Sequence, residues 1–419
     1  MTEGRRAART ASDRSPGAGA MIRACIDRYT RFMLAGYLRR LVVIMAVLLT
    51  IALTIDLWPQ IGRVAGDDNA ALPVALWRIA RFAGLRTPGL LAPLLPFACF
   101  LAVAWTETAY THAGERLFIW NSGRPPVLCL PASIVFGLIV GLADFTADAV
   151  LGPAAMRVQM TERLGSDGQR LDRGHTGDIQ WIARPDGLLR TEIVYGPPPE
   201  LRRVTFFKLD AGGELQEVDQ AARATQIRDT PGWQLENGTV WTAWPPSDRR
   251  TAPRDSDEAG QGRETQFDRR VLQLDLEPLW LSVYGIEPQY LSLAMLHALA
   301  PFDHPPQSHG LFRTRLQTLY SELALPAAMA LFAASLAILW QPHRVMAGAL
   351  AGTLLAGYLA HSATKAFLVL GQNGYLTPAV AAWAVPVALL AATLGAFGLK
   401  GARLPKAGAK ASARWARAE

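Results

Sequence analysis

Three basic residues have the types and positions to bind an anionic ligand together. Arg63, Arg157 and Lys365 each fall near the end of a predicted membrane span that lies away from the chain termini, so they would lie at one height around a helical bundle. An arginine guanidinium binds a phosphate through two hydrogen bonds, and a lysine ammonium offers a point charge. Each residue alone could equally extend to the membrane interface. The three together suggest a site for an anionic ligand.

A polar stretch between two apolar segments, TAYTHAGERLFIWNSGRPP, could instead bind a protein. It predicts a short amphipathic helix near 113–123, because glycine can end a helix in the left-handed conformation and Pro125-Pro126 prevents its continuation. The alternative is a simple connecting loop between two spans. The residues that a docking site would use are Glu115, Arg116, Trp120 and Gly123.

Asp144 and Asp148 are four residues apart near the end of a predicted span, which puts them on one helical face. Charges inside a membrane are costly and usually face a bundle interior or water. These two lie near the interface, so both a functional and a purely interfacial role stay open. His297 and His361 could relay protons, and packed or interfacial histidines are the alternative.

Motifs of nucleotide binding and hydrolysis are missing. No Gly-Lys pair precedes Ser or Thr as in a phosphate-binding loop, and HExxH and GxSxG do not occur. The three cysteines, Cys25, Cys99 and Cys129, lack the paired spacing of a zinc site. We therefore expect no zinc site and no nucleotide-binding site in this chain.

Composition favours a membrane protein. Half of the 419 residues are hydrophobic, 18% are charged, and the net charge is +7. The apolar residues gather in the two ends of the chain, next to arginine-rich termini, which fits cytoplasmic anchoring better than binding to nucleic acid. Residues 1–20 show no cleavable signal peptide and are expected to form a disordered tail, so that Met21 is a possible start.

Six segments are apolar and long enough to cross a bilayer, which takes about 20 residues. We predict spans at roughly 41–57, 89–106, 127–151, 322–340, 345–370 and 376–399. The first three belong to a block over 21–160 and the last three to a block over 318–400, with a connector at 276–317 and a basic tail at 401–419. Since both termini are basic, the rule that positive loops stay inside places both in the cytoplasm, and the segment after the third span outside.

Residues 165–275 differ in kind from both blocks. Short β-rich runs such as RRVTFFKLD and GWQLENGTVWTAW alternate with breaks rich in Gly, Pro, Asp and Asn. This pattern predicts a β-sandwich or jelly roll. The expected fold is therefore a membrane α-helical bundle of six transmembrane helices with an inserted periplasmic β-jelly-roll domain.

Several motifs over residues 26–400 resemble the lipopolysaccharide-export permease family, the LptF/LptG pair. Asp27-Arg28-Tyr29 matches the family's opening before the first span, and Asp56 falls where the LptG branch carries an aspartate. GERLFIWNSG holds a glutamate and a glycine at the family's separation, although the family's preceding serine is Gly114 here. The polar entry into span four and the layout of spans five and six are also similar.

The resemblance implies a non-enzymatic permease subunit in the inner membrane. It would pair with a related permease and bind a separate dimeric ATPase at the helix near 113–123, and that ATPase alone would bind ATP. Lipopolysaccharide would be extracted from the membrane, its phosphates held by Arg63, Arg157 and Lys365, and passed to a periplasmic jelly-roll bridge protein.

Two other functions stay open. One is a different envelope permease of the ABC type, which would usually have four spans or a much larger external domain. The other is a membrane-anchored enzyme acting on envelope glycolipid, for which the pair Asp144 and Asp148 is the one candidate. The sequence leaves the choice between the LptF and LptG branches open, and also the variant of lipopolysaccharide.

Overall fold

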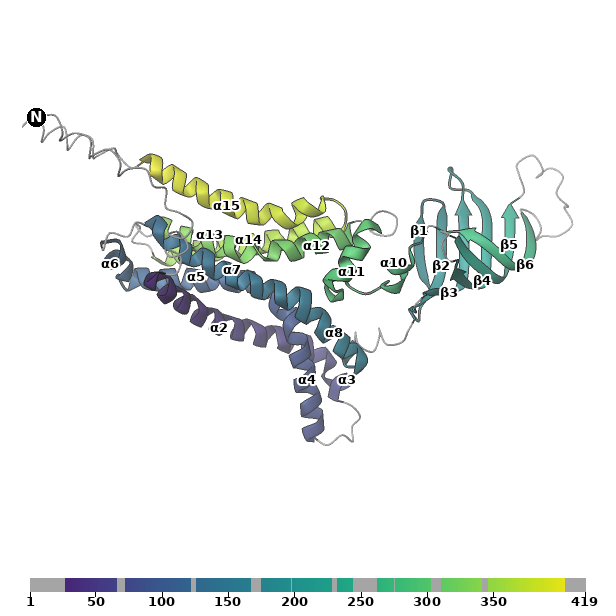
Figure 1. Cartoon of the computed structure of the whole chain (residues 1–419), viewed down its shortest axis with the longest axis horizontal. Coiled ribbons are helices and arrows are strands. Elements are labelled where there is room, and N and C mark those ends of the chain that lie inside the picture. Colours follow the sequence, from purple (N-terminus) through teal and green to yellow (C-terminus); the bar gives the residue numbers. More distant parts are fainter. Residues whose placement is uncertain are drawn as a thin grey trace, which may run out of the picture.

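The computed structural model describes residues 27–65, 72–121, 126–166, 175–196, 198–227, 232–243, 262–274, 276–302, 310–340 and 346–403. Within them an α-helical bundle occupies one part of the molecule and a β-sheet the other (Figure 1). The predicted tail at 1–20, Gly123, and most of the predicted basic tail at 401–419 lie outside the described residues.

The first half of the bundle follows the chain without a long break. Its elements are α2 (Arg28–Leu57), η1 (Trp58–Gln60), α3 (Ile61–Ala65), α4 (Leu72–Leu91), η2 (Ala92–Leu94), α5 (Leu95–His112), α6 (Glu115–Asn121), η3 (Pro126–Cys129), α7 (Leu130–Thr146), η4 (Ala147–Leu151) and α8 (Gly152–Thr161). Asp27 caps α2, since its carboxylate accepts a 2.7 Å hydrogen bond from the backbone N–H of Arg28. The helix begins before the predicted first span at 41–57, so the basic residues that precede this span belong to the same helix.

The second half of the chain returns through a connector to the bundle. Its elements are α10 (Pro278–Ser282), η5 (Pro288–Tyr290), α11 (Leu293–Leu299), η6 (Ala300–Phe302), α12 (Leu311–Glu322), α13 (Leu325–Trp340), α14 (Met346–Gln372) and α15 (Pro378–Arg403). Among the described residues, five helices are long and apolar enough to cross a membrane, and the bent pair of α12 and α13, counted as one span, makes a sixth segment. The six predicted spans are confirmed in this sense.

The fourth span starts earlier than the sequence predicts. We expected it to begin at Glu322, but α12 begins at Leu311 and meets α13 at a bend of 50°. Pro326 accounts for the bend, because its ring nitrogen cannot donate the helical hydrogen bond to the carbonyl of Glu322. Because α12 is polar, the hydropathy pattern predicted only the apolar α13 as part of the fourth span.

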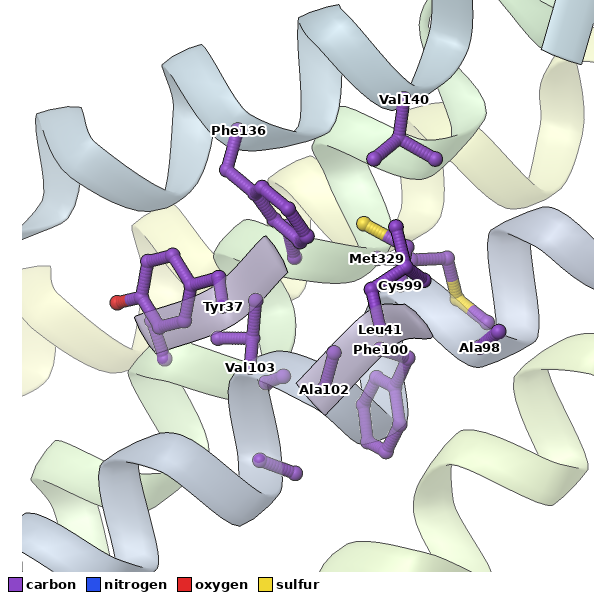
Figure 2. Close-up of a cluster of buried hydrophobic side chains, with 14 of the residues drawn as sticks. Tyr37, Leu41, Ala98, Cys99, Phe100, Ala102, Val103, Phe136, Val140 and Met329 are labelled. Carbon is purple, nitrogen blue, oxygen red and sulfur yellow. The ribbon is translucent and has the colours of Figure 1, made fainter. Parts of the chain in front are cut away.

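The core of the bundle joins α2, α5, α7 and α13. Figure 2 shows Tyr37, Phe100, Phe136 and Met329 among its buried side chains, and all four are at most 2% exposed. The rings of Tyr37 and Phe136 lie 5.2 Å apart in a tilted arrangement. Aromatic packing of this kind adds to the stabilisation that burial itself gives.

Two glycines let α7 pack unusually close to the bend. A Cβ on Gly137 would lie 2.3 Å from the Cα of Ala327, and a Cβ on Gly141 would lie 2.5 Å from the carbonyl oxygen of Leu323. The pair forms the G-x-x-x-G spacing that membrane helices use for backbone contact. This contact fixes α7 against the junction of α12 and α13.

The inserted domain is a single antiparallel sheet in the order β1-β2-β3-β4-β5-β6. The strands are β1 (Gln180–Arg184), β2 (Gly187–Val194), β3 (Glu200–Leu209), β4 (Leu215–Gln226), β5 (Gly232–Ala243) and β6 (Gly262–Gln273). A jelly roll requires two sheets joined by Greek-key connections, whereas each described strand here pairs with the next one along the chain. The β-rich domain is confirmed, and its described strands form a meander.

One face of the sheet is buried and continuous with the connector. Residues alternate between buried and exposed along β2, as expected for a strand with one covered face. Leu201 and Trp233 of the sheet belong to the same hydrophobic cluster as Trp280 of α10 and Leu319 of α12. The segment after the sheet therefore ties the β-domain to the bundle.

Asp219 makes the stability of the sheet depend on pH. This β4 carboxylate is 0% exposed, and burial raises its pKa to about 6 although the Arg270 guanidinium, at 3.2 Å, acts in the opposite direction. The folded state then binds more protons than the unfolded state between about pH 4 and pH 6, so stability falls as the pH rises through this window. The fall is at most about 3 kcal/mol for a shift of two pKa units.

We expect Asp219→Asn to flatten this dependence. Hydrogen exchange of peptides from β3 to β5 in the full chain, compared with wild type at each pH, measures it. Asp268→Asn, an exposed position on β6, is the matched control and should change nothing. An equal pH dependence in wild type and Asp219→Asn would contradict the assignment.

Candidate functional site

The short helix α6 lies at the end of the bundle away from the sheet (Figure 1). Glu115 in its first turn is exposed, and Phe118, one turn further on, is 76% exposed. Exposed aromatic rings are enriched in the surfaces by which proteins contact one another. The sequence pattern missed Phe118, although its spacing of three from Glu115 puts the two on one face.

Arg116 occupies a different place from the one that the sequence suggests. Its side chain is 2% exposed and forms an ion pair with Glu107 of α5, which is equally buried. The hydroxyl of Tyr37 in α2 donates a hydrogen bond to the same carboxylate. Arg116 therefore belongs to the bundle and connects α6 to α5 and α2, and it does not lie on the exposed face of α6. Gly123 and the side chain of Trp120 lie outside the described residues.

The three basic residues of the predicted anion site lie on three different helices. Arg63 on α3 and Arg157 on α8 are exposed, and α4 packs against both helices. Arg157 donates from Nε to the carbonyl oxygen of Pro153 at 3.4 Å. In the described part of the chain no hydrogen bond or ion pair joins Arg63, Arg157 and Lys365 to one another.

Asp56 at the end of α2 forms a bidentate ion pair with Arg86 of α4. The two hydrogen bonds measure 2.9 Å from Nε and 2.7 Å from Nη2, a geometry that makes such pairs strong. Arg86 also lies 3.4 Å from the hydroxyl of Tyr290 in η5. Arg86 thus links Asp56 at the end of the first span to Tyr290 in the connector that follows the sheet. Asp56 is the aspartate that the resemblance associates with the LptG branch.

A cluster of five charged residues lies where α7 and η4 meet α12 and α14. The Nη1 atom of Arg315 is 2.7 Å from a carboxylate oxygen of Asp148 and 3.7 Å from one of Glu322. Asp144 is 0% exposed. Lys365 lies near enough to interact electrostatically with all three carboxylates. We name this set, Asp144, Asp148, Arg315, Glu322 and Lys365, the charged cluster.

The spacing of four residues in the sequence could have indicated part of this cluster. Gly137, Gly141, Asp144 and Asp148 recur at spacings of four, three and four residues, so one face of the helix presents two glycines and then two carboxylates. Arg315 and Glu322 are seven apart on α12 and share a face in the same way. Ionisable residues inside a membrane bundle usually have a function.

A cavity of about 230 Å³ lies beside the cluster, between α4, η4, α8 and η5. Polar residues and apolar ones line it together: Leu85, Arg86, Gly89, Leu90, Pro93, Asp148, Gly152, Met156, Gln159, Gln289 and Tyr290. Gln159 is 3% exposed, and its amide nitrogen donates to the carbonyl of Leu85 at 3.2 Å. Its Oε1 has no hydrogen-bond partner in the described parts of the chain.

Among the residues that the structure describes, no group of three or more His, Cys, Asp or Glu side chains is arranged to hold a metal ion. The carboxylates of the charged cluster face basic side chains instead.

Comparison with known families identifies the family to which the chain is similar. The model of the family described as "Lipopolysaccharide export system permease LptF/LptG" matches residues 31–398, which spans both halves of the bundle and the sheet. A comparison with curated proteins gives no match.

Proposed function

The chain belongs to the LptF/LptG family of lipopolysaccharide export permeases, and we propose that it is one permease subunit of an ABC-type export complex. Its membrane-spanning helices and its family make it an integral inner-membrane protein and a transport subunit, not an enzyme. In the proposed complex a separate dimeric ATPase binds ATP, and a related permease forms the other half. The match covers both branches of the family and does not distinguish LptF from LptG.

The observation that carries this proposal is the separation of α6 from the sheet. The two lie at opposite ends of the bundle (Figure 1). An ATPase that docks at α6 would therefore act on the cytoplasmic side, while the sheet receives cargo in the periplasm and passes it to a bridge protein. Six spans with both termini in the cytoplasm satisfy this orientation.

Arg63, Arg157 and Lys365 are the candidates for binding the cargo, lipopolysaccharide. Lipopolysaccharide carries phosphates on an apolar anchor, so cations at the height of its headgroup would favour binding. The exposed Arg63 and Arg157 have the chemistry for this contact. Besides binding lipopolysaccharide, Lys365 has a second candidate role, because its charge interacts with the three carboxylates of the charged cluster.

Charge reversal at α6 tests the docking surface. We expect Glu115→Lys and Phe118→Ala each to lower the amount of ATPase that co-purifies with the permease about tenfold, since both remove exposed contacts without disturbing the buried pair of Arg116 and Glu107. Glu264→Lys, the same change at an exposed residue of β6, is the control and should leave recovery at the wild-type level. Wild-type recovery of the ATPase in both α6 variants would contradict the proposed role of this helix.

Labelling of introduced cysteines tests the orientation. Cysteines at positions 115 and 264, in a chain without its natural cysteines, should react with a membrane-impermeant maleimide on opposite sides of the membrane. Reaction of both from the same side would overturn the arrangement and favour the other functions considered above, including an enzyme acting on envelope glycolipid.

A further inference from the structure

The helix α4 continues through η2 into α5 and is much longer than a membrane crossing requires. Together Leu72–His112 comprise 41 residues, which rise about 60 Å at 1.5 Å each, whereas the apolar layer of a bilayer is about 30 Å thick. The far end of α5 leads into α6, so the surplus length lies at the other end, in α4. Most of α4 is therefore outside the apolar layer.

The chain bends where α4 meets the bundle. Pro88 lies inside α4 and Pro93 inside η2. A proline cannot donate the helical hydrogen bond, and helices bend at such positions. Figure 1 shows that α4 runs across the direction of α2 and α7 and leaves the side of the bundle. Since α2 and α7 cross the membrane, a helix in this direction lies along the plane of the bilayer.

The side of α4 that faces away from the bundle is apolar. Leu72 and Leu76, four residues apart on one face, are 73% and 57% exposed, and Trp77 beside them is 64% exposed. Ala80 is exposed as well and continues this apolar row. The opposite side of the helix is covered, since Phe82 is 2% exposed. An uncovered apolar row marks a contact with a membrane or with another protein.

The charges beside the apolar row favour the membrane. α4 holds three arginines, Arg78, Arg81 and Arg86, and no acidic residue. Arg78 and Arg81 are exposed next to the row, and an ion pair between Arg81 and Glu162 ties this edge of α4 to the end of α8. An apolar side bordered by arginines is typical of a helix that lies in a membrane surface, where lipid phosphates attract the cations.

A second tryptophan lies at the same end of the bundle. Trp58 of η1, directly after α2, is 77% exposed. Ile51 and Ile55 are exposed on α2 and lead up to it, so the apolar outer surface of this span continues to the level of α3 and α4. Tryptophan is enriched where the apolar layer meets water, which is where Trp58 and Trp77 are expected in this arrangement.

We propose that the first part of α4, residues 72–81, docks on the outer leaflet of the membrane, and that its partner is a bilayer surface with anionic phospholipid headgroups. The apolar row enters the boundary of the apolar layer, and the two exposed arginines face the phosphates. Because α3 and α8 pack against α4, this docking also holds Arg63 and Arg157 at the height of the headgroups. The choice of leaflet rests on the orientation proposed above. An opposite orientation would change the leaflet and leave the depth of α4 unaffected.

Spin labels on the purified full chain in lipid nanodiscs measure this depth. In a chain without its natural cysteines, Leu76→Cys carries one label, and Gln266→Cys, at an exposed position of β6, is the control. We expect oxygen, which concentrates in lipid, to relax the label at position 76 several-fold more than a water-soluble nickel chelate does, and the reverse at position 266. A label at 76 that responds mainly to the nickel chelate would place α4 in water and overturn the proposal. Protection of that label from both reagents would assign the apolar row to a protein contact and overturn it as well.

Arg78→Glu tests the choice of anionic lipid. In wild type, we expect the ratio of oxygen to nickel accessibility at position 76 to rise about twofold when phosphatidylglycerol is added to phosphatidylcholine nanodiscs, because its headgroup brings negative charge. Arg78→Glu should abolish this rise, whereas Arg263→Glu, the same change at an exposed arginine of β6, should retain it. An equal rise in wild type and Arg78→Glu, or no rise in wild type, would overturn the assignment to anionic headgroups.

Discussion

Replacing Arg116 with methionine is expected to lower the stability of the bundle by about 3–5 kcal/mol, because it leaves the Glu107 carboxylate buried without its cation. Both side chains are 2% exposed, and the Tyr37 hydroxyl alone cannot balance the remaining charge. The measurement is the thermal midpoint of the purified chain in mild detergent. Glu115→Lys, on the neighbouring residue but exposed, should leave that midpoint unchanged.

A second variant separates the charge pair from simple packing. Glu107→Gln with Arg116→Met removes both charges at once, and replacing a buried pair by uncharged groups is often nearly neutral. The double variant should therefore recover most of the midpoint that Arg116→Met loses. If the double variant loses as much as Arg116→Met and Glu107→Gln lose separately, added together, the ion pair does not stabilise the attachment of α6.

Replacing Gly137 with alanine is expected to have the second largest effect. The new Cβ would meet the backbone of Ala327 at 2.3 Å, and main-chain atoms cannot rotate away as a flexible side chain can. Overpacking costs typically about 1–3 kcal/mol and occasionally more. The backbone contact puts this variant in the upper part of that range, and α7 should separate from the junction of α12 and α13.

The matched control for Gly137→Ala is Gly395→Ala on α15. No atom lies within 4 Å of a Cβ at Gly395, so this change should be neutral or slightly stabilising, since alanine favours helix over glycine by about 1 kcal/mol. The measurement is the thermal midpoint of each purified variant in mild detergent, compared with wild type. Equal midpoints would show that α7 and α13 do not approach as closely as described.

The spans were predictable because hydropathy is a local property. About 20 consecutive apolar residues indicate a crossing regardless of their neighbours, and the apolar segments predicted in this way lie in the long helices of the bundle. Strand pattern likewise predicted the β-rich insert. It could not predict the order of strands in the sheet, because alternation specifies which face is buried and not which strand is the neighbour.

The buried pairs were not predictable from local pattern. Arg116 in a polar stretch is typical of a surface residue, and only the packing of α5 against α6 reveals that Glu107, nine residues earlier, lies buried beside it. Asp144 and Arg315 are separated by the whole sheet in the sequence, so no local spacing could bring them together. Of the predicted docking residues, Glu115 is exposed on α6, and its binding role stays a prediction.

The length of α2 has a consequence for how the protein is held in its bilayer. Its 30 residues rise about 45 Å at 1.5 Å each, whereas the hydrocarbon layer is about 30 Å thick. The difference of about 15 Å corresponds to roughly three helical turns, so the first turns of α2, where Arg28 and Arg31 are exposed, lie among the lipid headgroups. Each cation there gains about 1 kcal/mol from anionic lipids, so lipid composition sets the depth at which this helix, and the bundle packed on it, comes to rest.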